Sequence, residues 1–307
     1  MQPSTLAHLL LFAVVAVWGA TFVLVKDALA DVSPLLFNFL RMVLAFVVLA
    51  VVNRRHLHLR SLSRRTVLMG LLVGVFLTAG YEFQTVGLGR TTASKSAFIT
   101  GLVVVFVPLL MVVPKLRPKG AKPPGATTWI GALLAFAGLV LLTTPAGTEF
   151  SRIFASIGIG DLLTLLCAVA FAGHLLSLAW AAQQVPAGLL ATLQIGAASV
   201  LMAVILPMGG RPVLHLTVRL LVTLVVTSVL ATAAAFTIQS YAQQHLSPTH
   251  TALILTMEPV FAWLTAVLVR HERFGPRALA GALLILVGIA VIELLPSLRR
   301  SELVVGS

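Results

Sequence analysis

Residues 251–269 read TALILTMEPVFAWLTAVLV, an apolar run that is interrupted near its centre by Glu258 and Pro259. The run has the length of a bilayer-crossing helix, which needs about 20 mostly apolar residues. Inside such a helix an ionised side chain costs about 2.5–3.5 kcal/mol on insertion scales, and Pro259 removes the backbone hydrogen bond to the Leu255 carbonyl. Both features are tolerated beside a water-filled cavity. The stretch therefore predicts a membrane helix with one face on such a cavity.

The composition of the whole chain also indicates a bilayer environment. The 307 residues are 59% hydrophobic and 10% charged, with a mean hydropathy of +1.05, whereas a soluble domain carries about 25% charged residues. The net charge of +12 comes from basic residues in short segments between apolar runs, a distribution typical of membrane topology signals. We therefore expect an integral membrane protein with no nucleic-acid partner. The single cysteine, Cys167, excludes an intramolecular disulfide.

The apolar runs predict an all-α membrane protein with ten transmembrane helices, because helices satisfy their own backbone hydrogen bonds in lipid. The first run is interpreted as a spanning helix and not as a removable signal peptide. Polar segments with turn-forming residues separate the runs. The expected spans are 6–26, 34–53, 66–86, 94–114, 127–143, 159–180, 187–206, 218–241, 249–270 and 277–295.

Basic residues in the loops orient the first half of the chain. With the N-terminus inside, nine of them lie on the cytoplasmic side (Arg54, Arg55, Arg60, Arg64, Arg65, Lys115, Arg117, Lys119 and Lys122) and four on the outer side (Lys26, Arg90, Lys95 and Arg152). The positive-inside rule therefore predicts that both termini are cytoplasmic. The second half runs against the rule, since Arg211, Arg219, Arg270, Arg273 and Arg277 fall outside.

Two segments of the first half recur in the second. QTVGLGRTTASKSAFI (84–99) aligns with QSYAQQHLSPTHTALI (239–254), and GALLAFAGLVLL (131–142) aligns with GALLILVGIAVI (281–292). The matches predict two five-helix repeats, 8–143 and 158–294. An odd number of spans inverts the second copy in the membrane, and inverted repeats of this kind serve alternating access in many secondary transporters.

The chain resembles the EamA family of the drug/metabolite transporter superfamily along nearly its whole length. The resemblance rests on WGATF (18–22), TTASKSAFITGLVVVFVPLL (91–110), MEPVFAWL (257–264) and GALLILVGIAV (281–291). It implies a central cavity that is lined by the first four helices of each half, with the fifth and tenth helices at the periphery. The basic residues of VRHERFGPR (269–277) are more numerous than this topology expects in an outer loop.

Polar residues inside the spans are the candidates for the cavity wall, and each keeps a structural alternative. Glu258 can be protonated and bonded to a neighbouring helix, Arg41 can extend to the outer interface, and His174 can be a satisfied packing residue. Arg41 and Glu82 have opposite charge at similar depth, so we expect an ion pair or a shared water-lined pocket. The candidates are Trp18, Thr21, Arg41, Tyr81, Glu82, Gln84, Thr100, His174, Gln194, Gln239, Thr256 and Glu258, with Pro108 and Pro259 as helix-breaking positions.

Glycines seven residues apart, Gly131 with Gly138 and Gly281 with Gly288, predict close helix packing without any chemistry.

No HExxH, GxSxG, Walker A or paired-carboxylate motif is present, so we expect neither an enzyme nor an ATP-driven pump, and no metal or cofactor. The leading hypothesis is a secondary-active exporter of small organic metabolites such as amino acids in a bacterial inner membrane. Protons are a candidate coupling ion, through Glu258 or Glu82, and a homodimer is a further option. The alternatives are a passive channel or facilitator, and a lipid-linked or scaffold role without a solute path.

Overall fold

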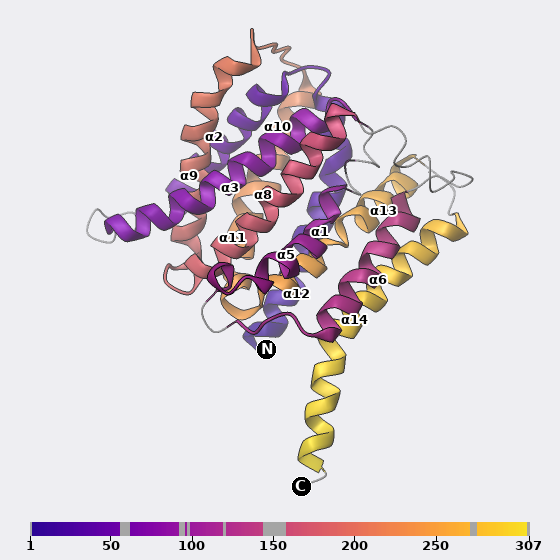
Figure 1. Cartoon of the computed structure of the whole chain (residues 1–307). Helices are drawn as coiled ribbons and strands as arrows, with labels where there is room; N and C mark the ends of the chain where they lie inside the picture. The colour runs from indigo at the N-terminus through magenta and orange to yellow at the C-terminus, as the bar shows by residue number, and fades with distance from the viewer. Residues whose placement is uncertain are drawn as a thin grey trace.

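The computed structural model describes residues 2–55, 62–91, 96, 99–118, 121–143, 158–270 and 275–305. Apart from turns, short connections and one isolated β-bridge between Val32 and Leu214, these residues form helices, as the apolar runs predict (Figure 1). The first half contains α1 (Pro3–Ala28), α2 (Pro34–Val52), α3 (Arg64–Leu88), α5 (Val103–Val112), the 3-10 turn η2 (Pro114–Leu116) and α6 (Ala126–Thr143). The second half contains α8 (Ile159–Ala182), α9 (Ala187–Ile205), the 3-10 turn η3 (Leu206–Gly209), α10 (Val218–Ser228), the π-helix η4 (Val229–Ala234), α11 (Ala235–His245), α12 (Pro248–Leu255), α13 (Glu258–Arg270) and α14 (Pro276–Val305).

Helix length and composition make the chain an integral, multi-pass membrane protein. Six helical segments of the described chain are long and apolar enough to cross a membrane: Pro3–Ala28, Pro34–Val52, Arg64–Leu88, Ile159–Ala182, Ala187–Gly209 and Val218–His245. Three apolar helices are shorter: Ile99–Val112, Ala126–Leu141 and Pro276–Ile292. Many leucines and valines on these helices are exposed, an arrangement that suits contact with acyl chains and not with water.

The expected ninth span, 249–270, is two helices and not one. α12 ends at Leu255 and α13 begins at Glu258. The turn between them is closed by the N–H groups of Thr256 and Met257, which donate to carbonyls three residues back. Pro259 lies in the first turn of α13, where a helix needs no N–H from it. The proline therefore permits a restart of the helix after the turn.

The fourth expected span, 94–114, is described only at residue 96 and from residue 99 onward. Its helix also contains a turn, at Leu102, directly before α5. Pro108 lies inside α5 and does not end it, so the expectation that this proline breaks the helix is wrong. In the eighth expected span, α10, η4 and α11 follow one another without a break.

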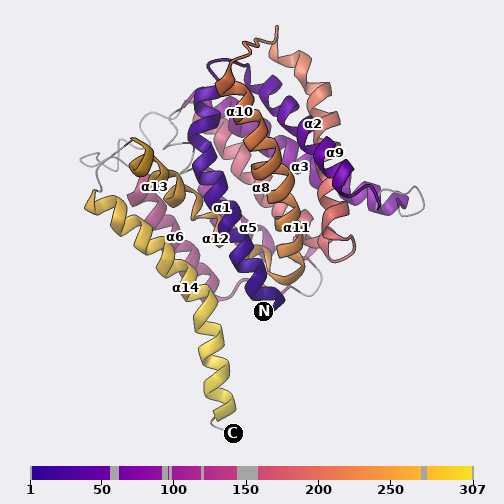
Figure 2. The same cartoon turned by 180° about the vertical axis from the view of Figure 1, so that it is seen from behind.

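Antiparallel helices α6 and α14 lie side by side at one edge of the bundle in both views (Figures 1 and 2). A Cβ added at Gly131 would lie 2.7 Å from the carbonyl oxygen of Gly288, and one added at Gly138 would lie 2.6 Å from that of Gly281. Only glycine permits these backbones to approach so closely. The close packing predicted from the glycine spacing is therefore confirmed.

Helices α3 and α8 also pack closely, and they place two walls of the cavity described below. A Cβ at Gly80 would lie 2.5 Å from the ring of Phe171, and one at Gly173 would lie 2.5 Å from the ring of Phe76. Each glycine thus receives an aromatic ring of the other helix. This packing fixes the height of α3 relative to α8.

The loop between α1 and α2 is tied to the segment that precedes α10. The N–H of Ser33 donates to the Val213 carbonyl at 3.0 Å, and the N–H of His215 donates to the Asp31 carbonyl at 2.7 Å. Arg219 Nη2 lies 2.7 Å from Asp31 Oδ2. Arg219, one of the basic residues that oppose the positive-inside rule, therefore has an acidic partner from the first half. Other residues used for orientation lie outside the described part: Arg60, Lys95, Lys119, Arg152 and Arg273.

We expect Gly138→Ala to lower the free energy of unfolding by about 1–3 kcal/mol, the usual cost of forcing extra volume into a packed contact. The measurement is unfolding of the purified protein in detergent. Gly125→Ala is the matched control, because a Cβ at Gly125 meets nothing within 4 Å. Equal losses for the two variants would contradict a tight crossing of α6 and α14.

The Asp31–Arg219 link predicts a pH-dependent contribution to stability. Hydrogen bonds from Arg219 and from Thr217 hold the pKa of Asp31 below its ordinary value. A lowered folded-state pKa means that the link stabilises the fold above the unfolded pKa of about 4 and loses its contribution as the pH falls through the folded pKa. We expect Asp31→Asn to lower the melting temperature at pH 7 and to differ progressively less from the wild type below pH of about 4.

The control for this experiment is the partner variant, Arg219→Gln. It is expected to show a similar loss at pH 7, and the double variant is expected to lose little more than either single one. A deficit of Asp31→Asn that stays constant from neutral to acid pH would show that ionisation of this carboxyl does not matter.

Candidate functional site

A cavity of about 1080 Å³, including the open space at its mouth, lies where helices of the two halves meet. Its wall comes from α1, α2, α3, α5 and the residues just before it, α8, α11, α12 and α13. Within the described chain, α6 and α14 contribute no lining residue, in agreement with the peripheral position that the family resemblance implies.

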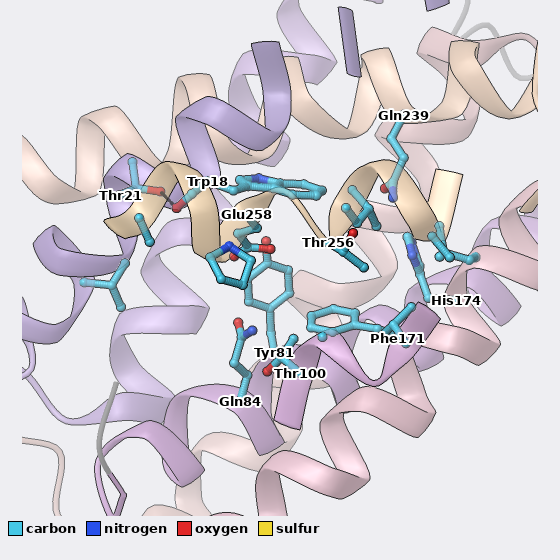
Figure 3. Close-up of a pocket in the computed structure, with 18 of the residues that line it drawn as sticks. Trp18, Thr21, Tyr81, Gln84, Thr100, Phe171, His174, Gln239, Thr256 and Glu258 are labelled. Atoms are coloured by element: carbon cyan, nitrogen blue, oxygen red, sulfur yellow. Dashed lines mark hydrogen bonds between the residues drawn. The ribbon is translucent and has the colours of Figure 1, made fainter. Parts of the chain in front are cut away.

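Most of the candidate residues lie together on this wall, as Figure 3 shows for those that it labels. The candidates that line the cavity are Trp18, Thr21, Arg41, Tyr81, Gln84, Thr100, His174, Gln239, Thr256, Glu258 and Pro259. Glu82, Gln194 and Pro108 do not line it. Glu82 and Gln194 are buried behind the wall, and Pro108 is buried within α5.

Sequence reasoning missed Thr85 and most of the apolar part of the wall: Val25, Leu88, Gly101, Val103, Phe171, Leu175, Phe236, Ala252, Leu255 and Ala262. Helical periodicity could have found several of these positions. Thr85 follows Tyr81 by four residues, and Phe171 and Phe236 each precede a candidate, His174 or Gln239, by three. Residues with these spacings share one helix face.

Arg41 is held in the wall by a π-helical turn. The N–H of Ala235 donates to the carbonyl of Leu230, five residues back, and so bypasses the Ala231 carbonyl that a regular α-helix would use. That carbonyl accepts hydrogen bonds from Trp18 Nε1 at 2.7 Å and from Arg41 Nη2 at 3.1 Å. π-Turns of this kind are frequent at functional sites.

Arg41 is 6% exposed, and its remaining contacts fix the guanidinium group. Nε donates to Thr232 Oγ1 at 2.6 Å, and Nη2 also donates to the Tyr81 hydroxyl at 3.1 Å. The guanidinium carbon lies 4.6 Å from the centre of the Tyr81 ring, within the range of a cation–π interaction. Neutral groups alone therefore hold this cation by direct contact in the described structure.

Glu258 provides the acidic group of the cavity. Figure 3 shows its side chain beside Trp18 and Tyr81 in the middle of the labelled residues. Electrostatic attraction acts between Glu258 and Arg41, but no hydrogen bond to the Glu258 carboxyl group is found among the described residues. Its backbone lies close to α1, because a Cβ at Gly19 would be 2.7 Å from the Glu258 carbonyl oxygen. The carboxyl group is therefore positioned at the wall and has hydrogen-bonding capacity to spare.

The expected ion pair between Arg41 and Glu82 is not formed. Tyr81 and Glu82 are neighbours on α3, so their side chains leave the helix about 100° apart, and Tyr81 takes the side that faces Arg41. Glu82 Oε2 instead accepts a hydrogen bond from Asn38 Nδ2 at 3.1 Å. Glu82 Oε1 is buried without a hydrogen-bond partner in the described structure.

Glu82 is nevertheless connected to the cavity through Asn38. The Asn38 amide donates to the Tyr81 carbonyl and to Glu82, and its oxygen accepts the Thr85 hydroxyl at 3.1 Å. Because a carbonyl can only accept, these contacts fix the amide orientation and commit the Thr85 proton to Asn38. Thr85 lines the cavity, so two hydrogen bonds separate Glu82 from the wall.

His174 and Gln239 form the polar end of the cavity opposite Thr21 (Figure 3). His174 Nε2 lies 2.9 Å from Gln194 Oε1, and Gln194 Nε2 donates to Ser240 Oγ at 3.1 Å. Gln194 therefore supports His174 from behind. Gln239 Oε1 is buried without a hydrogen-bond partner in the described chain, and its side chain lines the cavity.

The arrangement is suited to binding a small solute. Aromatic rings of Trp18, Tyr81, Phe171 and Phe236 surround one cation, one carboxyl group and several neutral hydrogen-bonding groups. The described residues contain no group of three or more His, Cys, Asp and Glu that could hold a metal ion.

Comparison with known proteins places the chain in a family. The model of the EamA-like transporter family matches residues 5–144 and 158–294. An uncharacterized transporter of Archaeoglobus fulgidus is 30% identical over 290 residues, which cover 94% of this chain and 86% of the relative. The uncharacterized transporter YvbV of Bacillus subtilis is 30% identical over 171 residues, covering 55% of this chain and 52% of YvbV.

A solved structure described as "Crystal structure of protein" has the same fold, with a TM-score of 0.77 and 20% identity over 96% of this chain and 98% of that one. The resemblance inferred from the sequence motifs is thereby confirmed, and the chain belongs to the EamA-like transporter family of the drug/metabolite transporter superfamily.

Proposed function

We propose that this membrane transporter is a secondary-active carrier of small zwitterionic metabolites such as amino acids, and that it works by alternating access between two inverted five-helix halves. The observation that carries the proposal is the cavity between the halves, which holds Arg41 and Glu258 in an otherwise neutral, largely aromatic wall. We further propose that it exports its solute across a bacterial inner membrane with both termini in the cytoplasm.

The crossing of α6 and α14 supports the inverted repeat. In the sequence alignment Gly131 corresponds to Gly281, and Gly138 corresponds to Gly288. In space Gly131 meets Gly288, and Gly138 meets Gly281. A twofold axis produces this exchange, in which position i contacts j′ and position j contacts i′.

Other helix pairs follow the same exchange. The first helix is α1 in the first half and α8 in the second. The fourth helix is α5 in the first half and the pair α12 and α13 in the second. The contact of α1 with α13 then corresponds to that of α8 with α5. The contact of α3 with α8 likewise corresponds to that of α11 with α1. The turns at Leu102 and Thr256 also interrupt corresponding helices, and both border the cavity. Interrupted helices at matching positions are the usual pointer to a transporter's binding site.

The two charged groups support the choice of a zwitterion. A solute carboxylate would approach Arg41, and a solute ammonium group would approach Glu258, so each charge of the protein would meet its opposite away from bulk water. Gln84, Gln239 and Thr85 offer neutral hydrogen bonds, and the aromatic rings suit an apolar side chain. A neutral sugar would offer no opposite charge to either Arg41 or Glu258, and a dianion would offer none to Glu258, which is costly in a cavity of low polarity.

Two carboxyl groups are available for proton coupling. Glu258 is at the wall, and Glu82 is connected to it through Asn38 and Thr85. A carboxyl group in a membrane segment costs more free energy when it is ionised than when it is protonated. We propose that a proton on one of these two carboxyl groups is exchanged for solute during the cycle.

The test is reconstitution of the full chain into vesicles with a panel of labelled amino acids, with and without an imposed pH gradient. We expect the wild type to accumulate at least one of them above equilibrium when the gradient is present. Hydrogen bonds to charged groups are worth about 1.5–3 kcal/mol, so Glu258→Gln is expected to weaken solute binding about 10- to 100-fold. Asp31→Asn is the control, since this carboxylate belongs to the outer loop and not to the cavity.

The outcomes separate the hypotheses. Equilibration of solute by the wild type without any accumulation would identify a passive channel or facilitator. No solute movement for the whole panel would contradict transport of amino acids. A Glu258→Gln/Glu82→Gln variant that still accumulates solute would show that neither carboxyl group carries the coupling proton.

A further inference from the structure

A second hollow, separate from the cavity, lies on the surface where the beginning of α3 meets the end of α8. This groove has an open volume of about 770 Å³, and its wall is formed by Arg64, Arg65, Leu68, Met69, Leu72 and Trp180. In Figure 1 the N-terminal end of α3 projects from the bundle. With the N-terminus of the chain inside, this end of α3 lies at the cytoplasmic face.

The charge at this end of α3 has no acidic partner among the residues that the structure describes. Arg64 and Arg65 occupy the first turn, which contains no acidic residue, and the N-terminus of a helix already carries a partial positive charge. The sequence has no Asp or Glu at 32–81 or at 162–257, which covers all of α2, α9, α10, α11 and α12. Two arginines at a helix N-terminus are therefore electrostatically unfavourable unless an external anion is present.

The two arginines differ in what they contact. Arg65 Nη2 donates to Gln184 Oε1 at 2.5 Å, and Gln184 Nε2 donates to the Trp180 carbonyl at 3.1 Å. These bonds hold the Arg65 guanidinium beside the end of α8. They do not neutralise its positive charge, because Gln184 is neutral. Arg64 is exposed and makes no hydrogen bond or ion pair within the described residues.

An apolar stripe leads away from these charges along α3. Arg64, Leu68 and Leu72 follow one another at intervals of four residues and so share one face. Leu68 is 51% exposed and Leu72 is 42% exposed. Continued to Val75, the stripe reaches about 16 Å from Arg64 at 1.5 Å per residue, a depth of close to half of the roughly 30 Å hydrocarbon core. Trp180 lies where the charged and apolar parts meet, a position that tryptophan favours at membrane interfaces.

We propose that this groove is a binding site for one anionic phospholipid of the cytoplasmic leaflet. The phosphate is bound by Arg64 and Arg65 at the positive end of the α3 dipole, and an acyl chain lies along Leu68 and Leu72. Charge complementarity selects an anionic headgroup, while the apolar stripe distinguishes a lipid from a free anion. The bound lipid contacts both α3 and α8, which carry Tyr81, Gln84, Phe171 and His174 of the cavity.

The experiment measures the melting temperature of the full chain in a neutral detergent during titration with phosphatidylglycerol or phosphatidylcholine. Phosphatidylglycerol is expected to raise the melting temperature in a saturable manner, and phosphatidylcholine is not. Each basic residue near an anionic lipid contributes to the binding free energy. Arg64→Gln should therefore raise the half-maximal lipid concentration about fivefold, and Arg64→Gln/Arg65→Gln should raise it about 30-fold.

Arg54→Gln/Arg55→Gln is the matched control, because it removes the same charge just after α2, outside the groove. This control is expected to respond to phosphatidylglycerol as the wild type does. Without lipid, the Arg64→Gln variant should melt no lower than the wild type and somewhat higher if anything, since Arg64 has no bond within the described chain to lose and its charge is unfavourable at the helix N-terminus. A merely structural role would instead lower the melting temperature in detergent alone.

Three results would overturn the proposal. One is an unchanged lipid response of Arg64→Gln/Arg65→Gln, and another is an equal loss in the control, which would indicate a general charge effect. The third is a stabilisation by inorganic phosphate or glycerol phosphate as large as that by phosphatidylglycerol, which would assign the groove to a soluble anion.

Discussion

In a bilayer every backbone N–H and C=O group has to find a partner inside the protein, and this constraint governs where the helices of this chain can be irregular. Three irregular points lie at or beside the cavity wall: the turn at Leu102, the turn of Thr256 and Met257, and η4, which bonds two residues of the wall. At η4 the carbonyl of Ala231 leaves the helical ladder and accepts Trp18 and Arg41 instead. The backbone group that the π-turn releases is thus the group that holds the cation of the cavity.

This coupling between backbone and side chain explains how a charged arginine is retained in the membrane. A buried guanidinium needs hydrogen bonds to as many of its donors as the site permits. Here the acceptors are a backbone carbonyl, a threonine and a tyrosine. None of them carries a charge, so the positive field of Arg41 stays available to the cavity. A carboxylate in direct contact would have cancelled that field, which is why the separation of Glu82 from Arg41 matters.

The apolar runs predicted the helices well, since α2, α9 and α6 begin and end within a residue or two of the expected spans. They could not predict η4, because one extra residue in a helical turn leaves an apolar pattern almost unchanged. The predicted ion pair between Arg41 and Glu82 was wrong for a related reason. Position along a helix gives the depth of a residue in the membrane but not the direction in which its side chain points. The cavity candidates were chosen by polarity, so Phe171, Phe236 and the aliphatic part of the wall were missed.

The two halves present different chemistry at matching places, and this difference makes the two end states of the proposed cycle unequal. Arg41 and Gln194 are both the eighth residue of their helices, α2 and α9. Arg41 reaches the cavity through the π-turn, whereas Gln194 stays behind His174. If the halves exchange roles during transport, the charged side chain and the neutral one do not become equivalent. The two end states then differ in energy, and the difference depends on the charge of the solute that occupies the cavity.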